Sequence, residues 1–326
     1  MAKIKKVAVL TSGGDAPGMN AAVRAVVRAA IYHKLEVVGI EHGYEGMIKG
    51  ELFKLESKDM RNIIQRGGTL LRSARSLEFK TKEGRAIAYK NLKRLNIDAV
   101  VVIGGDGTFR GAGIFSQEYD IPFVGIPGTI DNDMYGTDFT IGFDTALNTV
   151  VETIDKIKDT ASAHDRTFFI EVMGRDSGFI ALQAGIATGA EAILIPEVKG
   201  QAEALRQLLM KAKKLKKSSN IILVAEGNNV GGAQELANQV KEEFHDLGIR
   251  VNVLGHMQRG GSPTAFDRFL ASRLGVAAVE ALIDNQRSIM VGYKNHEVVH
   301  VPFNKTIKGI QHINEELLKV ADILMI

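Results

Sequence analysis

The sequence predicts an α/β protein whose sheets are mostly parallel and whose chain is organised in two parts. Short apolar runs of strand length alternate with segments in which apolar residues recur at helical spacing. This β-α-β order implies parallel strands joined by right-handed connections. After a long helical segment at 146–162 the alternation starts again, and no linker rich in Pro or Ser precedes the restart.

Four strands are expected in the first half, at 6–10, 35–40, 99–103 and 123–126. Each is a short, mostly apolar run that ends at Gly, Pro or a polar residue. Helices are expected between them, at 20–30, 84–95 and 108–115. Asn20 is expected to cap the first helix, because its side-chain oxygen can accept from the exposed N–H groups of the first turn.

The second half repeats the pattern. Strands are expected at 167–172, 193–195, 221–225 and 250–254, with helices between them, notably at 201–215. The long helix at 146–162 that precedes these strands carries a stripe of aliphatic residues at helical spacing. We therefore expect a second α/β layer, and ligands commonly bind in a cleft between two such lobes.

Composition narrows the classes of function. The formal net charge of +3, from 41 basic and 38 acidic residues, is too small to predict nucleic-acid binding. The absence of cysteine excludes disulfides, thiolate metal sites and a cysteine nucleophile. We find no secretory signal and no apolar run of membrane-spanning length, so a cytoplasmic protein without membrane partners is expected.

Three of the first strands are each followed by a glycine-rich loop with carboxylates. The last of these loops presents Thr129, Asp131 and Asp133. Ordinary surface turns are also rich in Asp and Asn, because both hydrogen-bond to their own backbone. In an open parallel sheet, however, the loops after the strands share one edge, where ligands bind. Three such junctions favour one shared ligand site over coincidence.

Basic residues form a second group of candidates. The segment 66–75 carries three arginines among small residues, which suits polyanion binding, and an ordinary basic loop is an equally good explanation. Arg24 and Arg28 lie outside the apolar stripe of the first helix, where a solvated face is the alternative. The lysine-rich run 211–217 is typical of a solvated helix end.

The strand ends of the second half carry polar groups as well. Met173-Gly174-Arg175, Glu226 and the segment 255–261 each follow an expected strand. Cations there could bind a phosphate, and acceptors could bind the hydroxyls of a phosphorylated polyol. A structural role is the alternative explanation for His256.

The familiar nucleotide fingerprints are absent, including G-x-G-x-x-G in the first loop, G-x-x-x-x-G-K-[ST], and the protein-kinase H-R-D and D-F-G motifs. What remains is glycine backbone for phosphates, Asp106 for a metal, Asp131 for a hydroxyl proton, and several arginines. Phosphoryl transfer to an alcohol needs this set, since it depends on positioning, Mg²⁺, cationic charge and a base on the acceptor hydroxyl.

Five motifs occur in order: Gly13-Gly14-Asp15-Ala16-Pro17-Gly18-Met19-Asn20, Gly104-Gly105-Asp106-Gly107-Thr108, Pro127-Gly128-Thr129-Ile130-Asp131-Asn132-Asp133, Met173-Gly174-Arg175 and Gly255-His256-Met257-Gln258-Arg259-Gly260-Gly261-Ser262-Pro263. With them the sequence resembles, over essentially its whole length, the bacterial ATP-dependent 6-phosphofructokinases. The second motif alone also resembles NAD kinases and lipid kinases, whereas all five in this order are highly specific.

The resemblance implies an α/β fold of two Rossmann-like, three-layer lobes with mostly parallel sheets and a cleft between them. It implies an ATP-binding lobe at 1–141 plus 257–304 and a fructose 6-phosphate-binding lobe at 142–256 plus 305–326. The implied reaction is the ATP-dependent phosphorylation of fructose 6-phosphate at its 1-hydroxyl, the committed step of glycolysis. Its products are fructose 1,6-bisphosphate and ADP, and Mg²⁺ is the cofactor.

Site residues follow from the resemblance, position by position. ATP binding is implied for Gly14, Arg75, Ser76, Gly105, Asp106, Gly107 and Thr108, with Asp106 holding Mg²⁺. Asp131 matches the base on the 1-hydroxyl, and the other implied catalytic residues are Thr129, Asp133 and Arg175. Substrate binding is implied for Thr129, Ile130, Asp131, Arg166, Met173, Gly174, Arg175, Glu226, Arg250, His256, Met257, Gln258 and Arg259.

The resemblance also implies a homotetramer with shared active sites, because Arg166 and Arg250 match arginines that reach the sugar phosphate of a neighbouring subunit. Family members bind ADP or phosphoenolpyruvate at an effector site between subunits. The matching positions are Arg24, Arg28, Lys158, Gly189, Ala190, Glu191 and Lys217. Ser57 stands where well-regulated relatives carry an arginine, so weaker or altered effector control is expected.

Two alternatives stay open. Pyrophosphate-dependent relatives carry Asp where Gly107 stands and Lys where Gly128 stands, and both substitutions would fill the nucleotide pocket. The two glycines therefore favour ATP. A non-catalytic sugar-phosphate sensor would need neither a base nor a metal carboxylate, whereas Asp106, Asp131 and Asp133 are all present.

Overall fold

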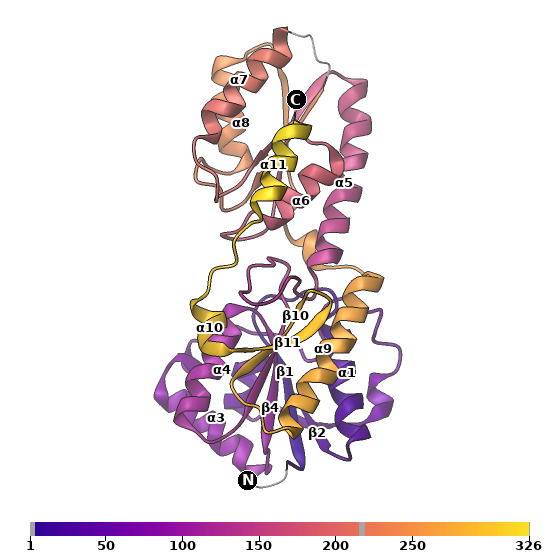
Figure 1. Cartoon of the computed structure of the whole chain (residues 1–326), viewed down its shortest axis with the longest axis vertical. Helices are drawn as coiled ribbons and strands as arrows, with labels where there is room; N and C mark the ends of the chain where they lie inside the picture. Colours follow the sequence, from indigo (N-terminus) through magenta and orange to yellow (C-terminus); the bar gives the residue numbers. More distant parts are fainter. Residues whose placement is uncertain (1–3, 215–218, 326) are drawn as a thin grey trace. The chain divides into compact units, whose positions relative to one another are not determined.

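The computed structural model describes residues 4–214 and 219–325, and the chain forms two compact units. The first unit contains the chain up to Ile130, Met134–Thr145 and Arg259–Gln311, and the second contains Asp131–Asp133, Ala146–Gln258 and the chain from His312. Each unit is an α/β structure built on one sheet (Figure 1). The lobe boundaries were expected at 141, 256 and 304. The corresponding divisions between the two units fall at 145, 258 and 311. Which substrate each lobe binds stays a prediction.

The first unit is organised on a seven-stranded sheet in the order β11-β10-β5-β4-β1-β2-β3. Its strands are β1 (Lys6–Thr11), β2 (Glu36–Ile40), β3 (Leu52–Leu55), β4 (Ala99–Gly104), β5 (Phe123–Pro127), β10 (Ile289–Lys294) and β11 (Glu297–Pro302). The inner strands are parallel, and β3 and β11 pair antiparallel at the two edges. Central strand β4 is buried along its whole length, which explains its continuous apolar run.

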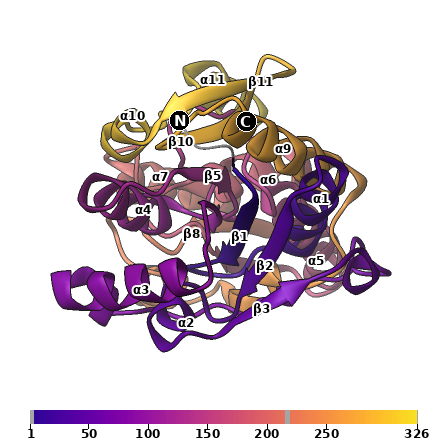
Figure 2. The ribbon, with the colours of Figure 1, turned by 90° about the horizontal axis from the view of Figure 1, so that it is seen from below.

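Helices cover both faces of this sheet (Figure 2). On one face α1 (Met19–Tyr32) packs beside α9 (Ala265–Ile283). On the other face lie α2 (Gly43–Lys49), α4 (Asp106–Glu118) and α10 (Phe303–Lys308), and α3 (Lys82–Arg94) packs on α2. Two short 3-10 helices, η1 (Ser57–Met60) and η2 (Glu78–Lys80), lie in the connections. The prediction of a mostly parallel α/β sheet is confirmed for this unit.

Asn20 does not cap the first helix, so that expectation was wrong. Helix α1 begins at Met19 after Gly18, which has a left-handed φ of 112°. The buried Asn20 side chain instead donates from Nδ2 to the carbonyls of Arg66 (3.1 Å) and Gly67 (3.0 Å). Its Oδ1 accepts from the backbone N–H of Leu70 (2.7 Å). The same amide that could cap a helix anchors the arginine-bearing loop.

The second unit has a parallel four-stranded sheet in the order β7-β8-β6-β9. Its strands are β6 (Arg166–Val172), β7 (Ala192–Leu194), β8 (Asn220–Ala225) and β9 (Gly248–Val253). Its helices are α5 (Phe143–Ala163), which begins in the first unit, α6 (Phe179–Thr188), α7 (Gln201–Lys214), α8 (Ala233–Glu243), α11 (Glu315–Leu324) and the 3-10 helix η3 (Gly255–Arg259). The expected helix end at Leu215 lies outside the described residues.

The faces of the second sheet are covered by different helices. Helices α7 and α8 pack on one apolar core, while α6 packs on β7 and β8 and is covered by α11 (Figure 1). Among the described residues, no helix combines the length and the apolar character that a membrane crossing requires.

Candidate active site

The three glycine-rich loops of the first unit lie together, because β5, β4 and β1 are parallel neighbours. Backbone hydrogen bonds join them: the N–H of Ser12 donates to Ile103 (3.0 Å) and the N–H of Gly128 donates to Gly104 (3.0 Å). The Thr108 hydroxyl donates to the carbonyl of Ser12 (3.1 Å). The strand-end residues expected to share one ligand therefore form one continuous edge.

The loop after β4 presents a helix N-terminus to this edge. Helix α4 begins at Asp106, directly after Gly105. A side chain at Gly104 would place its Cβ 2.4 Å from both the Ser12 carbonyl and the Thr108 hydroxyl, so close packing requires glycine there. The free N–H groups and partial positive charge of a helix N-terminus favour bound phosphate.

Tyr44 supports the first turn of α4 through a hydrogen bond and a stacked ring. Its hydroxyl donates to the carbonyl of Thr108 (2.5 Å) and its ring stacks on Phe79 with centroids 4.0 Å apart. Burial raises the pKa of Tyr44 far above its ordinary value, so the hydroxyl stays protonated and remains a donor. No sequence pattern marked this residue, because its partner is distant in the chain.

The space that a side chain at Gly107 would enter is open. A Cβ added there would meet no atom of the described residues within 4 Å. At Gly128, by contrast, a Cβ would lie 3.0 Å from Cγ2 of Ile103. The loop edge at Gly107 can therefore receive a ligand that an added side chain would displace.

Arg75 and Ser76 belong to the loop that Asn20 anchors. The Ser73 hydroxyl donates to the carbonyl of Gly13 (2.5 Å), which ties this loop to the first glycine loop. The Arg75 side chain is exposed, and the Ser76 hydroxyl accepts from the N–H of Phe79 (3.2 Å). An exposed guanidinium beside a glycine loop is suited to a polyphosphate.

Asp106 provides one carboxylate for a metal. It is half-exposed and pairs with Arg110 (3.0 Å), four residues along α4. No cluster of three or more His, Asp or Glu side chains with metal-binding geometry occurs in the described part of the chain. Mg²⁺ in nucleotide sites is typically held by one or two carboxylates together with phosphates and waters. The donor set therefore fits a Mg²⁺ ion that binds together with phosphates.

The carboxyl edge of the second sheet brings together another group of the expected residues. The Glu226 carboxylate accepts from the N–H of Arg175 (2.7 Å), and the N–H of Glu226 donates to Val172 (2.9 Å). The buried Gln258 side chain accepts from the N–H of Met173 (3.1 Å) and donates to Gly255 (3.0 Å). Gln258 thus joins two loops. The exposed His256 and Met257 side chains precede it in η3.

Arg175 sits in a strained turn with an exposed side chain. Its φ is 56°, a left-handed conformation that is uncommon for a residue with a side chain, and it follows Gly174 at φ 147°. The Ser177 hydroxyl donates to the carbonyls of Asp131 (2.9 Å) and Gly174 (2.9 Å). The Asp131 backbone is therefore held at the turn that carries Arg175.

Thr129, Ile130, Asp131 and Asp133 lie where the chain passes from the first unit to the second. Asp131 is buried, with 8% of its surface exposed, and Asp133 is half-buried. Thr129 and Asp131 are separated by one residue, so their Cα atoms are within about 7 Å of each other.

Two other expected arginines, Arg166 and Arg250, lie apart from the carboxyl edge of the second sheet. Arg166 begins β6, about 20 Å along the strand from Met173, and the exposed Arg250 pairs in register with Phe168. Neither lies with the carboxyl-edge loops of the second unit. Arg259 belongs to the first unit, where its guanidinium donates to the carbonyl of Asp15 (3.1 Å) and a Cβ at Gly14 would lie 2.6 Å from it.

The expected effector residues are divided between the two units. Arg24 and Arg28 lie four residues apart on α1, and burial together with the charge of Arg28 lowers the pKa of Arg24. Lys158 donates to the carbonyls of Thr188 and Gly189. Ala190 follows, and the Glu191 carboxylate accepts from the N–H of Ile221 (2.5 Å). Lys217 lies outside the described residues.

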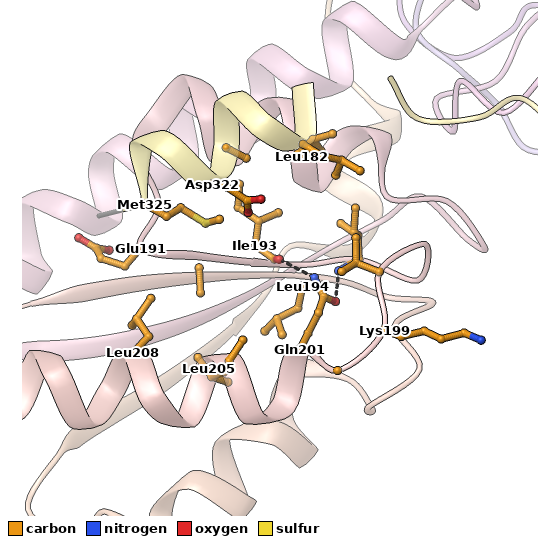
Figure 3. Close-up of a pocket in the computed structure, with 17 residues that line it drawn as sticks. Leu182, Glu191, Ile193, Leu194, Lys199, Gln201, Leu205, Leu208, Asp322 and Met325 are labelled. Atoms are coloured by element: carbon orange, nitrogen blue, oxygen red, sulfur yellow. Dashed lines mark hydrogen bonds between the residues drawn. The ribbon is translucent and has the colours of Figure 1, made fainter. Parts of the chain in front are cut away.

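The second unit also contains a pocket of about 470 Å³ between α7, β7 and α11 (Figure 3). Its lining is mostly apolar and includes Leu205, Leu208 and Met325, with Glu191 at one end. Gln201 lies in the lining, where its side-chain amide donates to the carbonyl of Ile193 (3.0 Å) and accepts from the N–H of Ile195 (2.9 Å). Among the described residues, no expected catalytic or sugar-phosphate residue lines it.

No sequence pattern had pointed to Asp267 or Ser177 as part of the site. Asp267 is fully buried in the first turn of α9 and accepts from Gly142 and Thr145. The pattern Thr264-Ala265-Phe266-Asp267 has the spacing of a helix capping box, which could have located it. Its partners lie more than 120 residues earlier, so the contacts themselves had no local signal.

Comparisons with known proteins agree on one family. A family model described as phosphofructokinase matches residues 6–282. The chain is 54% identical to ATP-dependent 6-phosphofructokinase 2 of Bacteroides thetaiotaomicron, covering 100% of both chains. It is also 54% identical to ATP-dependent 6-phosphofructokinase 1 of Thermus thermophilus, over 98% of this chain and 99% of the relative.

Solved structures show the same fold. Phosphofructokinase of Saccharomyces cerevisiae superposes on 93% of the chain with a TM-score of 0.88 and 40% identity. The chain spans 45% of that yeast chain. A pyrophosphate-dependent phosphofructokinase of Marinobacter aquaeolei matches with a TM-score of 0.87, over 99% of this chain and 92% of the other, at 22% identity. At that identity the match supports the fold alone.

Proposed function

Because the chain belongs to the phosphofructokinase family, we propose that it phosphorylates fructose 6-phosphate at the 1-hydroxyl with ATP. The products are fructose 1,6-bisphosphate and ADP, and the reaction is the committed step of glycolysis. The observation that carries the proposal lies in the chain itself. The glycine-loop edge of the first sheet ends at Thr129. Asp131 follows two residues later; its side chain is buried, and its backbone carbonyl is bonded at the Arg175 turn.

On the nucleotide side, the backbone of Gly105–Thr108 and the N-terminus of α4 bind phosphates, and Gly14, Arg75 and Ser76 add contacts from neighbouring loops. Asp106 would hold the metal ion. When bound, Mg²⁺ neutralises phosphate charge as the phosphoryl group moves. The open space at Gly107 leaves room for the nucleotide.

On the acceptor side, Asp131 removes the proton from the 1-hydroxyl as it attacks. Arg175 offsets the negative charge of the moving phosphoryl group, while Thr129 and Asp133 help to position it. The sugar phosphate is contacted by Met173, Glu226, His256, Met257 and Arg259. Ile130 and Gly174 complete this side of the site. Gln258 supports two of these loops from its buried position.

Assembly belongs to the same proposal. Arg166 and Arg250 lie away from the carboxyl edge of their own sheet, which supports a role toward the sugar phosphate of a neighbouring subunit. We propose a cytoplasmic homotetramer with shared active sites and an effector site that includes Arg24, Arg28, Lys158, Gly189, Ala190, Glu191 and Lys217.

A donor comparison tests the proposal. The protein is incubated with fructose 6-phosphate and Mg²⁺, with either ATP or pyrophosphate as donor, and product is measured for each. ATP should be the donor by a wide margin. Turnover with pyrophosphate alone would establish the pyrophosphate-dependent alternative, and sugar-phosphate binding without turnover of either donor would establish a sensor.

A further inference from the structure

Asp267, in the first turn of α9, is a charged group that the proposed reaction does not use. Its side chain has no solvent exposure. Oδ1 accepts from the N–H of Gly142 (2.8 Å), and Oδ2 accepts from both the N–H (2.8 Å) and the hydroxyl (2.5 Å) of Thr145. One carboxylate therefore holds the turn before α5 and the first turn of that helix.

The segment that Asp267 holds is bonded to the expected catalytic loop. The hydroxyl of Thr140 donates to the carbonyl of Thr129 (2.6 Å). The N–H of Ile141 donates to the carbonyl of Pro127 (2.9 Å). The loop with Thr129 is therefore connected to Asp267 through only a few residues, all within the first unit.

On its other side, Asp267 is connected to the segment that carries Arg259. The hydroxyl of Thr264 accepts from the N–H of Asp267 (3.2 Å) and donates to Asp144 (2.6 Å). Thr264 lies shortly after Arg259, whose guanidinium donates to the first glycine loop. The polar cluster thus joins two segments to which the proposed mechanism assigns substrate contacts.

Helix capping alone does not explain this arrangement. In a capping box the acidic side chain returns to the backbone N–H of the N-cap residue, here Thr264. That N–H instead donates to the hydroxyl of Thr145 (3.0 Å). The carboxylate of Asp267 turns away from its own helix and takes all its described hydrogen bonds from residues 142–145.

We propose that Asp267 is a positioning residue, which fixes the catalytic loop at Thr129 relative to the segment of Arg259. Its effect on turnover rests on the proposed function, and its effect on the 140–145 segment does not. An amide at this position can offer an oxygen to only one side, so the N–H groups of Gly142 and Thr145 cannot both keep their acceptor. The catalytic loop then loses a fixed support.

The test compares Asp267→Asn, Thr140→Val and the double variant, with Asp284→Asn as the matched control. Asp284 is exposed at the other end of α9, so the control makes the same chemical change on the same helix. Steady-state kinetics and hydrogen exchange of the Gly142 and Thr145 amides are measured on folded protein. Thr140→Val removes the bond to Thr129 and nearly preserves side-chain volume.

We expect Asp267→Asn to lower kcat at least tenfold and to speed exchange at both amides at least tenfold, with the control unchanged. The double variant should lose about as much kcat as the more damaging single variant, because both act on one support. Losses that multiply, or a kcat of Asp267→Asn within twofold of the wild type, would overturn the proposal.

Failure of Asp267→Asn to fold and failure of the wild type to turn over call for separate measurements. If Asp267→Asn does not fold, Thr145→Val removes the donating hydroxyl from the other side, and unchanged kcat and exchange in that variant would count against the proposal. If the wild type does not phosphorylate fructose 6-phosphate, the proposed function fails. Hydrogen exchange then decides separately, since unchanged protection of Gly142 and Thr145 in Asp267→Asn overturns the positioning role.

Discussion

Asp131 and Asp267 are both buried acidic residues, and they lie in different structural settings. Asp131 follows an apolar strand and a Pro-Gly break, at the end of that strand. Asp267 lies within a regular helix, and its partners are over 120 residues away in the chain. Asn20 had a strong local pattern for a helix cap, yet its amide bonds to a distant loop. Local chemistry predicts a residue's hydrogen-bonding capacity but not which distant partner uses it.

Asp131→Asn is expected to keep the fold and to lower kcat by roughly 10²–10⁴-fold, because a positioned base contributes about that much. The amide keeps the size of the side chain, and the Asp131 backbone carbonyl that binds Ser177 is unchanged. Steady-state kinetics with saturating substrates would measure the loss. A variant that retained more than about a third of the wild-type kcat would show that another group is the base.

Gly107→Asp is expected to abolish use of ATP without destabilising the protein. A Cβ added at Gly107 meets no described atom within 4 Å, so we expect the Asp side chain to enter the space proposed for the nucleotide and to bring a negative charge near phosphates. Gly107→Ala is the control for loss of glycine. KM for ATP and the melting temperature would be compared in the three proteins. Unchanged ATP kinetics in Gly107→Asp would place the nucleotide elsewhere.

Most of the buried parallel strands were predicted from the sequence, and the two edge strands of the first sheet were not. All four strands of the second sheet and four of the first were expected from apolar runs. β3, β10 and β11 were not expected. β3 and β11 are edge strands with mixed burial, and β3 has only four residues. β10 is an inner strand that is buried over most of its length, so its absence from the prediction was an oversight and not a lack of apolar pattern. Short, half-exposed strands lack the continuous apolar pattern that identifies a central strand.

Asn20→Ala is expected to release the arginine-bearing loop from α1. The substitution removes two donors and one acceptor at a buried site and leaves the Leu70 N–H without its partner. Stability should fall by about 1–3 kcal/mol, and KM for ATP should rise because Arg75 is less well placed. Urea unfolding and ATP saturation curves measure the two effects. Unchanged values for both would mean that the loop is held by other contacts.

The α5–α9 junction should respond to pH through Asp267. Burial raises the pKa of Asp267 to about 6, above its ordinary value of 3.8. The folded state therefore binds this proton more tightly than the unfolded state does. The resulting stabilisation is fully present below pH 3.8 and is lost as the pH rises through about 6.

The wild type should thus lose stability relative to Asp267→Asn as the pH rises from 4 to 7, by on the order of 2–3 kcal/mol. The comparison with the variant cancels the contributions of other carboxylates. Unfolding by urea at several pH values in this range measures the difference. A stability gap that stays constant with pH would show that Asp267 keeps an ordinary pKa.

At the scale of the whole molecule, the five motifs were enough to identify the family, and the overall α/β class followed from the alternation of elements. Subunit contacts and ligand binding were predicted from resemblance, because no local pattern requires Arg166 or Arg250 to act on another subunit. The spacing of apolar residues along the sequence predicts the helix and strand layers and the positions of the strand ends. It does not predict which surfaces meet in an assembly.

Effector control is expected to be weak. Ser57 begins η1 without a charged side chain, and the neighbouring Lys58 pairs with Glu56 (2.9 Å). A missing guanidinium removes a charge-assisted hydrogen bond of about 1.5–3 kcal/mol, which is as large as typical allosteric coupling. ADP and phosphoenolpyruvate should each shift half-saturation by fructose 6-phosphate less than tenfold, and Ser57→Arg should increase the shift. A larger shift in the wild type would contradict this explanation.

We propose that this chain couples ATP consumption to phosphorylation of the sugar at one hydroxyl. The most direct measurement is the stoichiometry of ADP and fructose 1,6-bisphosphate formed from ATP and fructose 6-phosphate, with the phosphorylated carbon assigned by NMR. We expect equal amounts of the two products, a new phosphate at the 1-position, and no turnover when either Mg²⁺ or the sugar phosphate is omitted. ADP formed without fructose 6-phosphate, or no ADP formed with it, would contradict the claim.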